Sequence, residues 1–310
     1  MARPVIIDCD PGQDDAVMLL LACASPELDI LGVTTVAGNV PLELTHRNAR
    51  RMLELAGRGD IPVYAGCGRP LVRAPITAEA IHGRSGIDGY PVRDPARPLA
   101  AGHAVDFIVE TCRAADDVVT LVPTGPLTNI AAALEQAPDI AAKIGQIVLM
   151  GGALARGSRI SPVAEFNILS DPDAAQIVFG SGVPLVAFGL DLTQQVITTP
   201  ARLERIRAIA TPAADAVAAM LTFYGKAVSE NSCAGGGALH DPCPVAWLIE
   251  PDLFRGERVN VVVETASEIT LGMTVVDRDG VTGRPANTLW MRDADADGFY
   301  DLLIERLARL

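Results

Sequence analysis

Short hydrophobic runs alternate along this chain with longer segments of helical character. The first run, residues 5–7, predicts a strand buried on both faces, and an Ala-, Met- and Leu-rich helix follows from Ala16. Further strands are predicted at 28–36, 61–65, 118–122, 147–150, 185–188, 259–263 and 273–276, the last two with antiparallel pairing left open. Further helices are predicted at 42–55, 101–115, 213–230, 240–249 and 299–310. This alternation predicts an α/β fold with an open, mostly parallel central sheet and helices on both faces.

One segment breaks the alternation. Residues 66–98 are rich in Gly, Pro and Arg and show no periodicity, so they form either an active-site loop or a disordered stretch. We find no internal repeat and no linker, and we therefore expect one domain over residues 1–310.

Composition narrows the class of protein. With 49% hydrophobic residues among 310, the chain can bury a large core. The net charge of −13 argues against a nucleic-acid-binding surface. We expect no signal peptide and no membrane span, because the first strand starts at once and no apolar run is long enough. The six scattered cysteines lack a Cys-x-x-Cys pair, which favours reduced thiols in a cytoplasmic protein.

Four carboxylates crowd the turn between the first strand and the first helix. Asp8, Asp10, Asp14 and Asp15 lie within eight residues, and residues 5–23 contain no Lys or Arg. Such anions repel one another unless a cation lies among them, and carboxylate oxygens are the ligands that Ca²⁺ and Mg²⁺ prefer. Asp14 or Asp15 could instead cap the helix. Capping does not account for Asp10, two residues after Asp8.

Three later motifs combine turn residues with polar side chains. In TGPLTN at 124–129, Thr128 or Asn129 is expected to cap the helix IAAALEQ. AEFN at 164–167 precedes Asp171-Pro172, which predicts an N-cap followed by proline in the first turn. The same helix-start pattern occurs at Asp241-Pro242, directly after His240.

These motifs resemble those of a known family. DCDPGQDDA at 8–16 is similar to the N-terminal signature of the inosine–uridine-preferring nucleoside hydrolases, and TGPLTN, AEFN with DPDAA, and HDP match further motifs in the same order. The resemblance runs from the first strand to the last helix. It implies a Rossmann-like α/β fold and Ca²⁺-dependent hydrolysis of the N-glycosidic bond of ribonucleosides to ribose and free base, with inversion, in nucleoside salvage.

The resemblance also implies roles for individual residues. Asp10, Asp15, Asp241 and the Thr124 carbonyl would hold one Ca²⁺ per subunit, which can bind a water and the ribose diol. Asp10 would take the proton of that water. His240 would face the nucleobase and protonate it as it leaves. The substrate-binding residues would be Asp14, Asn39, Glu165 and Asn167 for the sugar, and His82 and Tyr224 for the base.

Two positions depart from the family pattern. Arg159 stands where the family commonly has an asparagine that contacts the 5′ end of the sugar, which leaves room for a modified sugar. Val228 replaces a residue that is polar or aromatic in several members. The preferred base is therefore left open. The family implies a homodimer or homotetramer whose partner is a small ribonucleoside, not a nucleic acid or a membrane.

Alternative interpretations come from other classes. Asp8-Cys9-Asp10 resembles the DxD strand end of metal-dependent phosphohydrolases, which also need a downstream lysine, yet the only lysines are Lys143 and Lys226. A catalytically inactive ribose- or nucleoside-binding protein is the second alternative. Residues 293–298 imitate the start of an EF-hand loop but lack its final glutamate, so we interpret them as an acidic start to the last helix.

Overall fold

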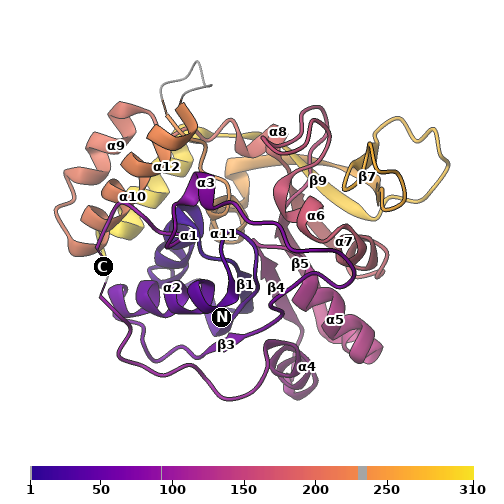
Figure 1. Ribbon diagram of the computed structural model, residues 1–310, viewed down its shortest axis with the longest axis horizontal. Coiled ribbons are helices and arrows are strands. Elements are labelled where there is room, and N and C mark those ends of the chain that lie inside the picture. Colours follow the sequence, from indigo (N-terminus) through magenta and orange to yellow (C-terminus); the bar gives the residue numbers. More distant parts are fainter. Residues whose placement is uncertain (1, 92, 230–235) are drawn as a thin grey trace.

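A central sheet organises the computed structural model, which describes residues 2–91, 93–229 and 236–310 (Figure 1). The order of its nine described strands is β3-β2-β1-β4-β5-β6-β9-β7-β8. The strands are β1 (Arg3–Cys9), β2 (Leu28–Thr35), β3 (Val63–Ala65), β4 (Val119–Pro123), β5 (Ile144–Met150), β6 (Leu185–Phe188), β7 (Phe254–Val263), β8 (Thr274–Asp277) and β9 (Thr288–Ala294).

Helices follow most of the strands. They are α1 (Gln13–Cys23), α2 (Leu42–Leu55), α3 (Glu79–His82), α4 (Ala104–Ala114), α5 (Thr128–Gln136), α6 (Phe166–Ser170), α7 (Pro172–Phe179), α8 (Leu190–Thr193), α9 (Pro200–Arg207), α10 (Pro212–Ser229), α11 (Pro242–Ile249) and α12 (Ala296–Leu307). Two short 3₁₀ turns lie at Pro138–Lys143 and Pro251–Leu253. Within the described ranges, no helix is both long enough and apolar enough to cross a bilayer.

The core lies in two layers, one on each face of the sheet. Val5 and Ile7 of β1 pack in a cluster with α1, α2, α10, α11 and α12, whereas Ile6 packs in a second cluster with α4, α5 and α7. Successive side chains of a strand point to opposite faces, so a strand covered on both sides must be continuously apolar. The predicted mostly parallel sheet with helices on both faces is confirmed.

Among the described strands, only the last three form antiparallel pairs. Strand β7 pairs antiparallel with β8 and with β9, while every other pairing among the described strands is parallel. The antiparallel option for the predicted strands at 259–263 and 273–276 is therefore right. The sequence did not predict β9, although it lies inside the sheet between β6 and β7 and buries Trp290 completely.

The other predictions agree in place and differ mainly at element ends. Helix α9 and the short helices α3, α6 and α8 were not predicted. The expected helix at 213–230 is observed as α10, and its predicted last residue, Glu230, lies outside the described residues. The EF-hand-like stretch at 293–298 ends β9 and begins α12, where Asp295 is the N-cap and its side chain accepts from the backbone N–H of Gly298.

The chemistry-bearing residues lie beyond the carboxyl ends of the parallel strands. Asp10 follows β1, Asn39 follows β2, and Thr124 directly follows β4. The irregular segment at 66–98 starts from the same edge, since it leaves β3, and through α3 it brings His82 to the Gln13 side chain at the start of α1. Ligand sites of open α/β sheets occur at this edge.

Candidate active site

Asp15 joins the turn after β1 to the turn after β4. Its Oδ2 accepts from the backbone N–H of Gly12, the N-cap of α1, at 3.0 Å. Its Oδ1 accepts from the Thr124 hydroxyl at 2.9 Å. The capping role considered for Asp14 or Asp15 therefore holds for Asp15, which also fixes the position of a second loop at the site.

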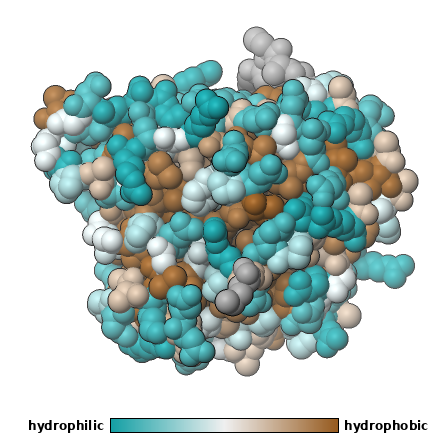
Figure 2. Space-filling model, turned by 180° about the vertical axis from the view of Figure 1, so that it is seen from behind, coloured by the Kyte–Doolittle hydropathy of each residue, from teal (hydrophilic) through white to brown (hydrophobic). Residues whose placement is uncertain are grey.

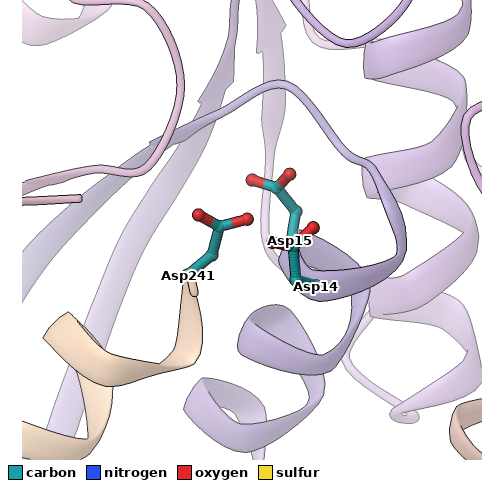
Figure 3. A group of neighbouring side chains, drawn as sticks. All are labelled: Asp14, Asp15 and Asp241. Carbon is teal, nitrogen blue, oxygen red and sulfur yellow. The ribbon is translucent and has the colours of Figure 1, made fainter. Parts of the chain in front are cut away.

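Asp14, Asp15 and Asp241 form an acidic cluster. Each offers a carboxylate oxygen, and these oxygens lie within 4.8 Å of one another, with all three residues buried (Figure 3). Figure 3 shows Asp14 and Asp15 at the start of α1 and Asp241 at the start of α11, facing one another. Asp241 occupies the N-cap position of α11, yet its side chain makes no capping hydrogen bond and remains directed at the cluster.

Burial and mutual repulsion raise the pKa of these carboxyl groups. Burial, and next the charge of Asp15, raise the pKa of Asp14 to about 7. Burial raises the pKa of Asp15 to about 6. Burial, followed by the charges of Asp14 and Asp15, raises the pKa of Asp241 well above its usual range. The cluster is therefore unstable as a set of free anions near neutral pH.

Asp10 lies beside the cluster and is held by the chain after β2. Its Oδ2 accepts from the backbone N–H of Asn39 at 2.7 Å. The Asn39 side-chain amide donates to the Asp10 carbonyl at 3.1 Å and to Asp15 Oδ2 at 3.4 Å. The backbone of Gly38 packs so closely that a Cβ there would lie 2.1 Å from Asp10 Oδ2. Asp10 is thus immobilised with one oxygen unused.

The donor set fits a hard divalent cation. Oδ1 of Asp10 and Oδ1 of Asp14 are fully buried and have no hydrogen-bond partner among the described residues. Buried polar atoms are almost always paired, so two unpaired carboxylate oxygens at one site indicate a binding site for an electropositive partner. Carboxylate oxygens from two helix starts suit Ca²⁺ or Mg²⁺.

Asn167 and Glu165 line the neighbouring edge of the site. The Asn167 amide donates to the Thr124 carbonyl at 2.7 Å and to the Met150 carbonyl at 3.2 Å. Glu165 caps α6: its Oε1 accepts from the N–H of Asn167, and its Oε2 from Gly152 and Ile168. Its carboxylate therefore accepts from three backbone N–H groups, a contact set that sequence reasoning did not foresee.

Two histidines and a tyrosine form the other wall. His82 stacks on Tyr224 with ring centroids 5.7 Å apart. Nδ1 of His240 lies 2.7 Å from the Thr193 hydroxyl. Burial lowers the pKa of His240 to about 4, and burial together with the charge of His240 lowers that of His82 to about 3. Both imidazoles are therefore neutral at pH 7.

Arg159 and Lys143 lie away from the acidic cluster. Arg159 is exposed, and its guanidinium donates to the carbonyls of Ala227 and Val228, at 3.1 and 2.5 Å. Lys143 donates to the carbonyl of Ala115, which precedes β4 and so lies at the opposite edge of the sheet. Lys143 therefore cannot serve the phosphohydrolase alternative.

Beneath the site is a polar network that sequence reasoning missed. The Asn129 amide donates to Asp8 Oδ1 at 2.7 Å and to the Thr35 carbonyl at 3.0 Å, and its Oδ1 accepts from the N–H of Cys67.

The Thr128 hydroxyl donates to Asp171, whose side chain also caps α7 as predicted. The expectation that Thr128 or Asn129 caps α5 is wrong, because both side chains bond to distant segments; the position of Asn129 in TGPLTN was the available signal.

Comparisons with known proteins agree with this site. The family model for inosine-uridine preferring nucleoside hydrolases matches residues 5–301. The chain is 50% identical to a protein of Shewanella sp. (strain ANA-3) named pyrimidine-specific ribonucleoside hydrolase RihA, over 99% of this chain and 97% of that protein.

Solved structures give the same result. A purine-preferring ribonucleoside hydrolase from Gardnerella vaginalis matches with a TM-score of 0.92 and 35% identity, covering 99% of this chain and 98% of that one. A plant nucleoside hydrolase matches with a TM-score of 0.92 and 33% identity, covering 99% of both chains. The chain belongs to the inosine-uridine preferring nucleoside hydrolase family and is an enzyme that hydrolyses N-glycosyl bonds of ribonucleosides.

Proposed function

We propose that the protein uses one Ca²⁺ per subunit to hydrolyse ribonucleosides to ribose and free base, with inversion at the anomeric carbon. The observation that carries this proposal is the buried cluster of Asp14, Asp15 and Asp241, which lies beside Asp10 with two carboxylate oxygens unpaired. The ion would be held by Asp10, Asp15, Asp241 and the Thr124 carbonyl, with Asp14 at its margin. When bound, it supplies the positive charge that lowers the pKa of a water and orients the ribose diol.

The chain's own residues supply proton transfer and positioning. Asp10 accepts the proton of the attacking water, since Asn39 fixes one of its oxygens and leaves the other free. Asp14, Asn39, Glu165 and Asn167 contact the ribose hydroxyls. Attack from the face opposite the base gives inversion.

His240 donates the hydrogen bond or proton that the leaving base requires. A neutral imidazole carries one N–H, so the Thr193 hydroxyl decides which nitrogen bears it. If the hydroxyl donates to Nδ1, the proton lies on Nε2. His82 and Tyr224 contact the base on the other side.

Pyrimidine ribonucleosides are the proposed preferred substrates, because the relative that is 50% identical is named for that specificity. The test is to incubate purified protein with uridine, cytidine, inosine and adenosine and to assay free ribose, with and without phosphate. Equal activity after rigorous removal of metal contradicts Ca²⁺ dependence. A requirement for phosphate with formation of ribose 1-phosphate contradicts hydrolysis, and no turnover on any nucleoside supports the inactive binding-protein alternative.

We also propose a cytoplasmic homodimer or homotetramer that acts in nucleoside salvage. Hydrophobic side chains gather in patches across the face seen in Figure 2. Ile269 and Val281, which flank β8, are each 86% exposed. The cysteines within the described ranges are free, as in a reducing compartment. Light scattering coupled to size-exclusion chromatography measures the assembly, and a monomer at micromolar concentration contradicts it.

A further inference from the structure

Gln13, the only polar side chain of the DPGQDDA motif without a role so far, makes two contacts with His82 and one with Asp88. Its Oε1 lies 2.7 Å from His82 Nδ1. Its Nε2 donates to the carbonyl of His82 at 2.9 Å and to that of Asp88 at 3.2 Å. Gln13 is fully buried, and its amide makes a hydrogen bond at every one of these atoms.

The two backbone carbonyls determine which way the Gln13 amide points. A carbonyl oxygen only accepts, so both positions require the NH₂ group of the amide, and a flipped amide would place three oxygens together. Oε1 must therefore face Nδ1 of His82. Because Oε1 has no hydrogen to donate, the hydrogen of this contact belongs to Nδ1.

The other ring nitrogen of His82 is consequently a bare acceptor. Burial and the charge of His240 lower the His82 pKa to about 3, so the ring is neutral and carries a single N–H. That hydrogen lies on Nδ1, which leaves a lone pair on Nε2. Nε2 makes no hydrogen bond to any residue that the structure describes, and it is not among the fully buried unpaired atoms.

His82 is held in this position by close packing. A Cβ at Gly12 would lie 2.5 Å from His82 Nδ1 and 3.0 Å from Asn39 Nδ2, so the ring lies against the turn that begins α1. On its other side the ring stacks on Tyr224. Rotation of the ring would also break the contact with Gln13, so the direction of Nε2 is fixed.

We propose that Gln13 is a positioning residue that holds His82 as the Nδ1–H tautomer, so that Nε2 accepts a hydrogen bond from an N–H of the substrate base. This inference rests on the proposed function, in which His82 contacts the base. The matching group is a ring imide N–H such as that of a uracil-type base. A base with a lone pair at that atom meets the lone pair of Nε2 and is disfavoured.

The proposal separates the roles of the two histidines. With no hydrogen on Nε2, His82 cannot protonate the leaving base through that atom, and His240 is left as the donor. His82 then determines which base is accepted, and Gln13 acts on that choice without touching the substrate.

Two variants of Gln13 distinguish tautomer control from a structural role. Gln13→Met removes both the acceptor and the donors at similar size. Gln13→Glu loses the donors to the two backbone carbonyls but retains an acceptor for Nδ1–H. A purely structural role predicts similar damage in both variants. Tautomer control predicts that Gln13→Glu, although it places a carboxylate oxygen against the two backbone carbonyls, keeps the Nδ1–H tautomer and the base selectivity at pH 8, whereas Gln13→Met loses both.

The first readout is independent of activity. Two-bond ¹H–¹⁵N correlation spectra of ¹⁵N-histidine-labelled protein at pH 8 report which ring nitrogen is protonated, and His82→Gln assigns the signals. We expect Nδ1–H in wild type and Gln13→Glu, and a shift towards Nε2–H in Gln13→Met. An Nε2–H signal for His82 in wild type overturns the proposal, whether or not the protein hydrolyses nucleosides.

The second readout is base selectivity. We compare kcat/KM for uridine with that for the riboside of 2-pyrimidinone, whose N3 carries a lone pair in place of the N–H. The ratio should fall about three- to tenfold in Gln13→Met, the discrimination expected from one hydrogen bond, and stay near wild type in Gln13→Glu. An unchanged ratio in a correctly folded Gln13→Met overturns the role in selectivity. If no nucleoside is turned over, the proposed function fails while the tautomer result stands.

Discussion

The side-chain amide of Asn129 donates to Asp8 Oδ1 at 2.7 Å. The same amide also donates to the Thr35 carbonyl at the end of β2 and accepts from the Cys67 N–H after β3, so it connects these two segments. Every polar atom of this amide is used, and Asn129 and Asp8 are fully buried. The network thus lies directly beneath Asp10 and joins three strand ends to α5.

Replacing Asn129 should therefore lower both stability and activity. Asn129→Leu leaves the Cys67 N–H without its partner and removes one of the two donors to Asp8 Oδ1 and to the Thr35 carbonyl. We expect a loss of about 3 kcal/mol in the free energy of unfolding. Urea unfolding followed by circular dichroism measures it. Asn260→Ala, which removes only a bond to the Pro285 carbonyl at the periphery, is the control and should cost under about 1 kcal/mol. Equal losses in the two variants would contradict this view of the network.

Removing Asp15 should abolish metal binding. Asp15 lies in the acidic cluster and is bonded to Gly12 and Thr124, so Asp15→Ala removes a ligand and loosens two loops. Elemental analysis of dialysed protein should show one calcium per wild-type subunit and none in the variant, with activity lost in parallel. Asp139→Ala, at an exposed ion pair with Arg113, should retain both. Calcium at full occupancy in Asp15→Ala would exclude the proposed site.

Substrates with different leaving groups should separate His240 from Asp10. Natural bases need a donor as the C–N bond breaks, whereas p-nitrophenolate departs unaided. His240→Ala should lose about 10²- to 10⁴-fold in kcat on uridine and little on p-nitrophenyl riboside. Asp10→Ala should impair both substrates alike. A loss of equal size on both substrates for His240→Ala would assign His240 to sugar binding or structure.

Acid should destabilise the fold through His82. Its pKa is about 3 in the folded protein and about 6.5 in the unfolded chain, so below pH 6.5 only the unfolded chain takes up the proton. The stability that neutral His82 contributes is present above pH 6.5 and is lost progressively as the pH falls towards 3. At pH 5.5 the loss is about 1.4 kcal/mol.

The comparison with His82→Gln isolates this effect. Urea unfolding at pH 7.5 and 5.5 gives the loss for each protein, and the wild type should lose about 1.4 kcal/mol more than the variant. The same loss in both proteins would mean that folded His82 takes up the proton near its ordinary pKa.

Local sequence signals predicted most of the fold and the gathering of the site. Buried parallel strands are continuously apolar and helices carry their own turn signals, so β1, α2 and β6 could be placed from short windows. Strand β9 was missed because TLWMRDA is short and mixed in character, and its position depends on pairing with β6 and β7, both distant in sequence. Strand pairing across such distances leaves no local pattern.

In the site too, local sequence predicted some features, whereas others depend on contacts between distant segments. The acidic motif after β1 indicated a cation site, and the structure brings Asp14 and Asp15 of this motif together with Asp241, which is distant in sequence. Local sequence predicted that Asn129 caps a helix, but its side chain instead donates to Asp8, which is far away in the sequence. Contacts between distant segments determine which partner each side chain binds, and a single sequence does not reveal these contacts.

The place of β9 has a consequence for synthesis of the chain on the ribosome. Until residues 288–294 emerge, β6 remains an open edge and β7 with β8 has nothing to join, although every side chain assigned to the acidic cluster has already been made. An unfinished chain thus exposes two strand edges that are prone to pairing with other chains. Strand β9 completes the sheet, and α12 follows it. We therefore expect a chain truncated before β9 to aggregate and not to fold into a smaller active enzyme.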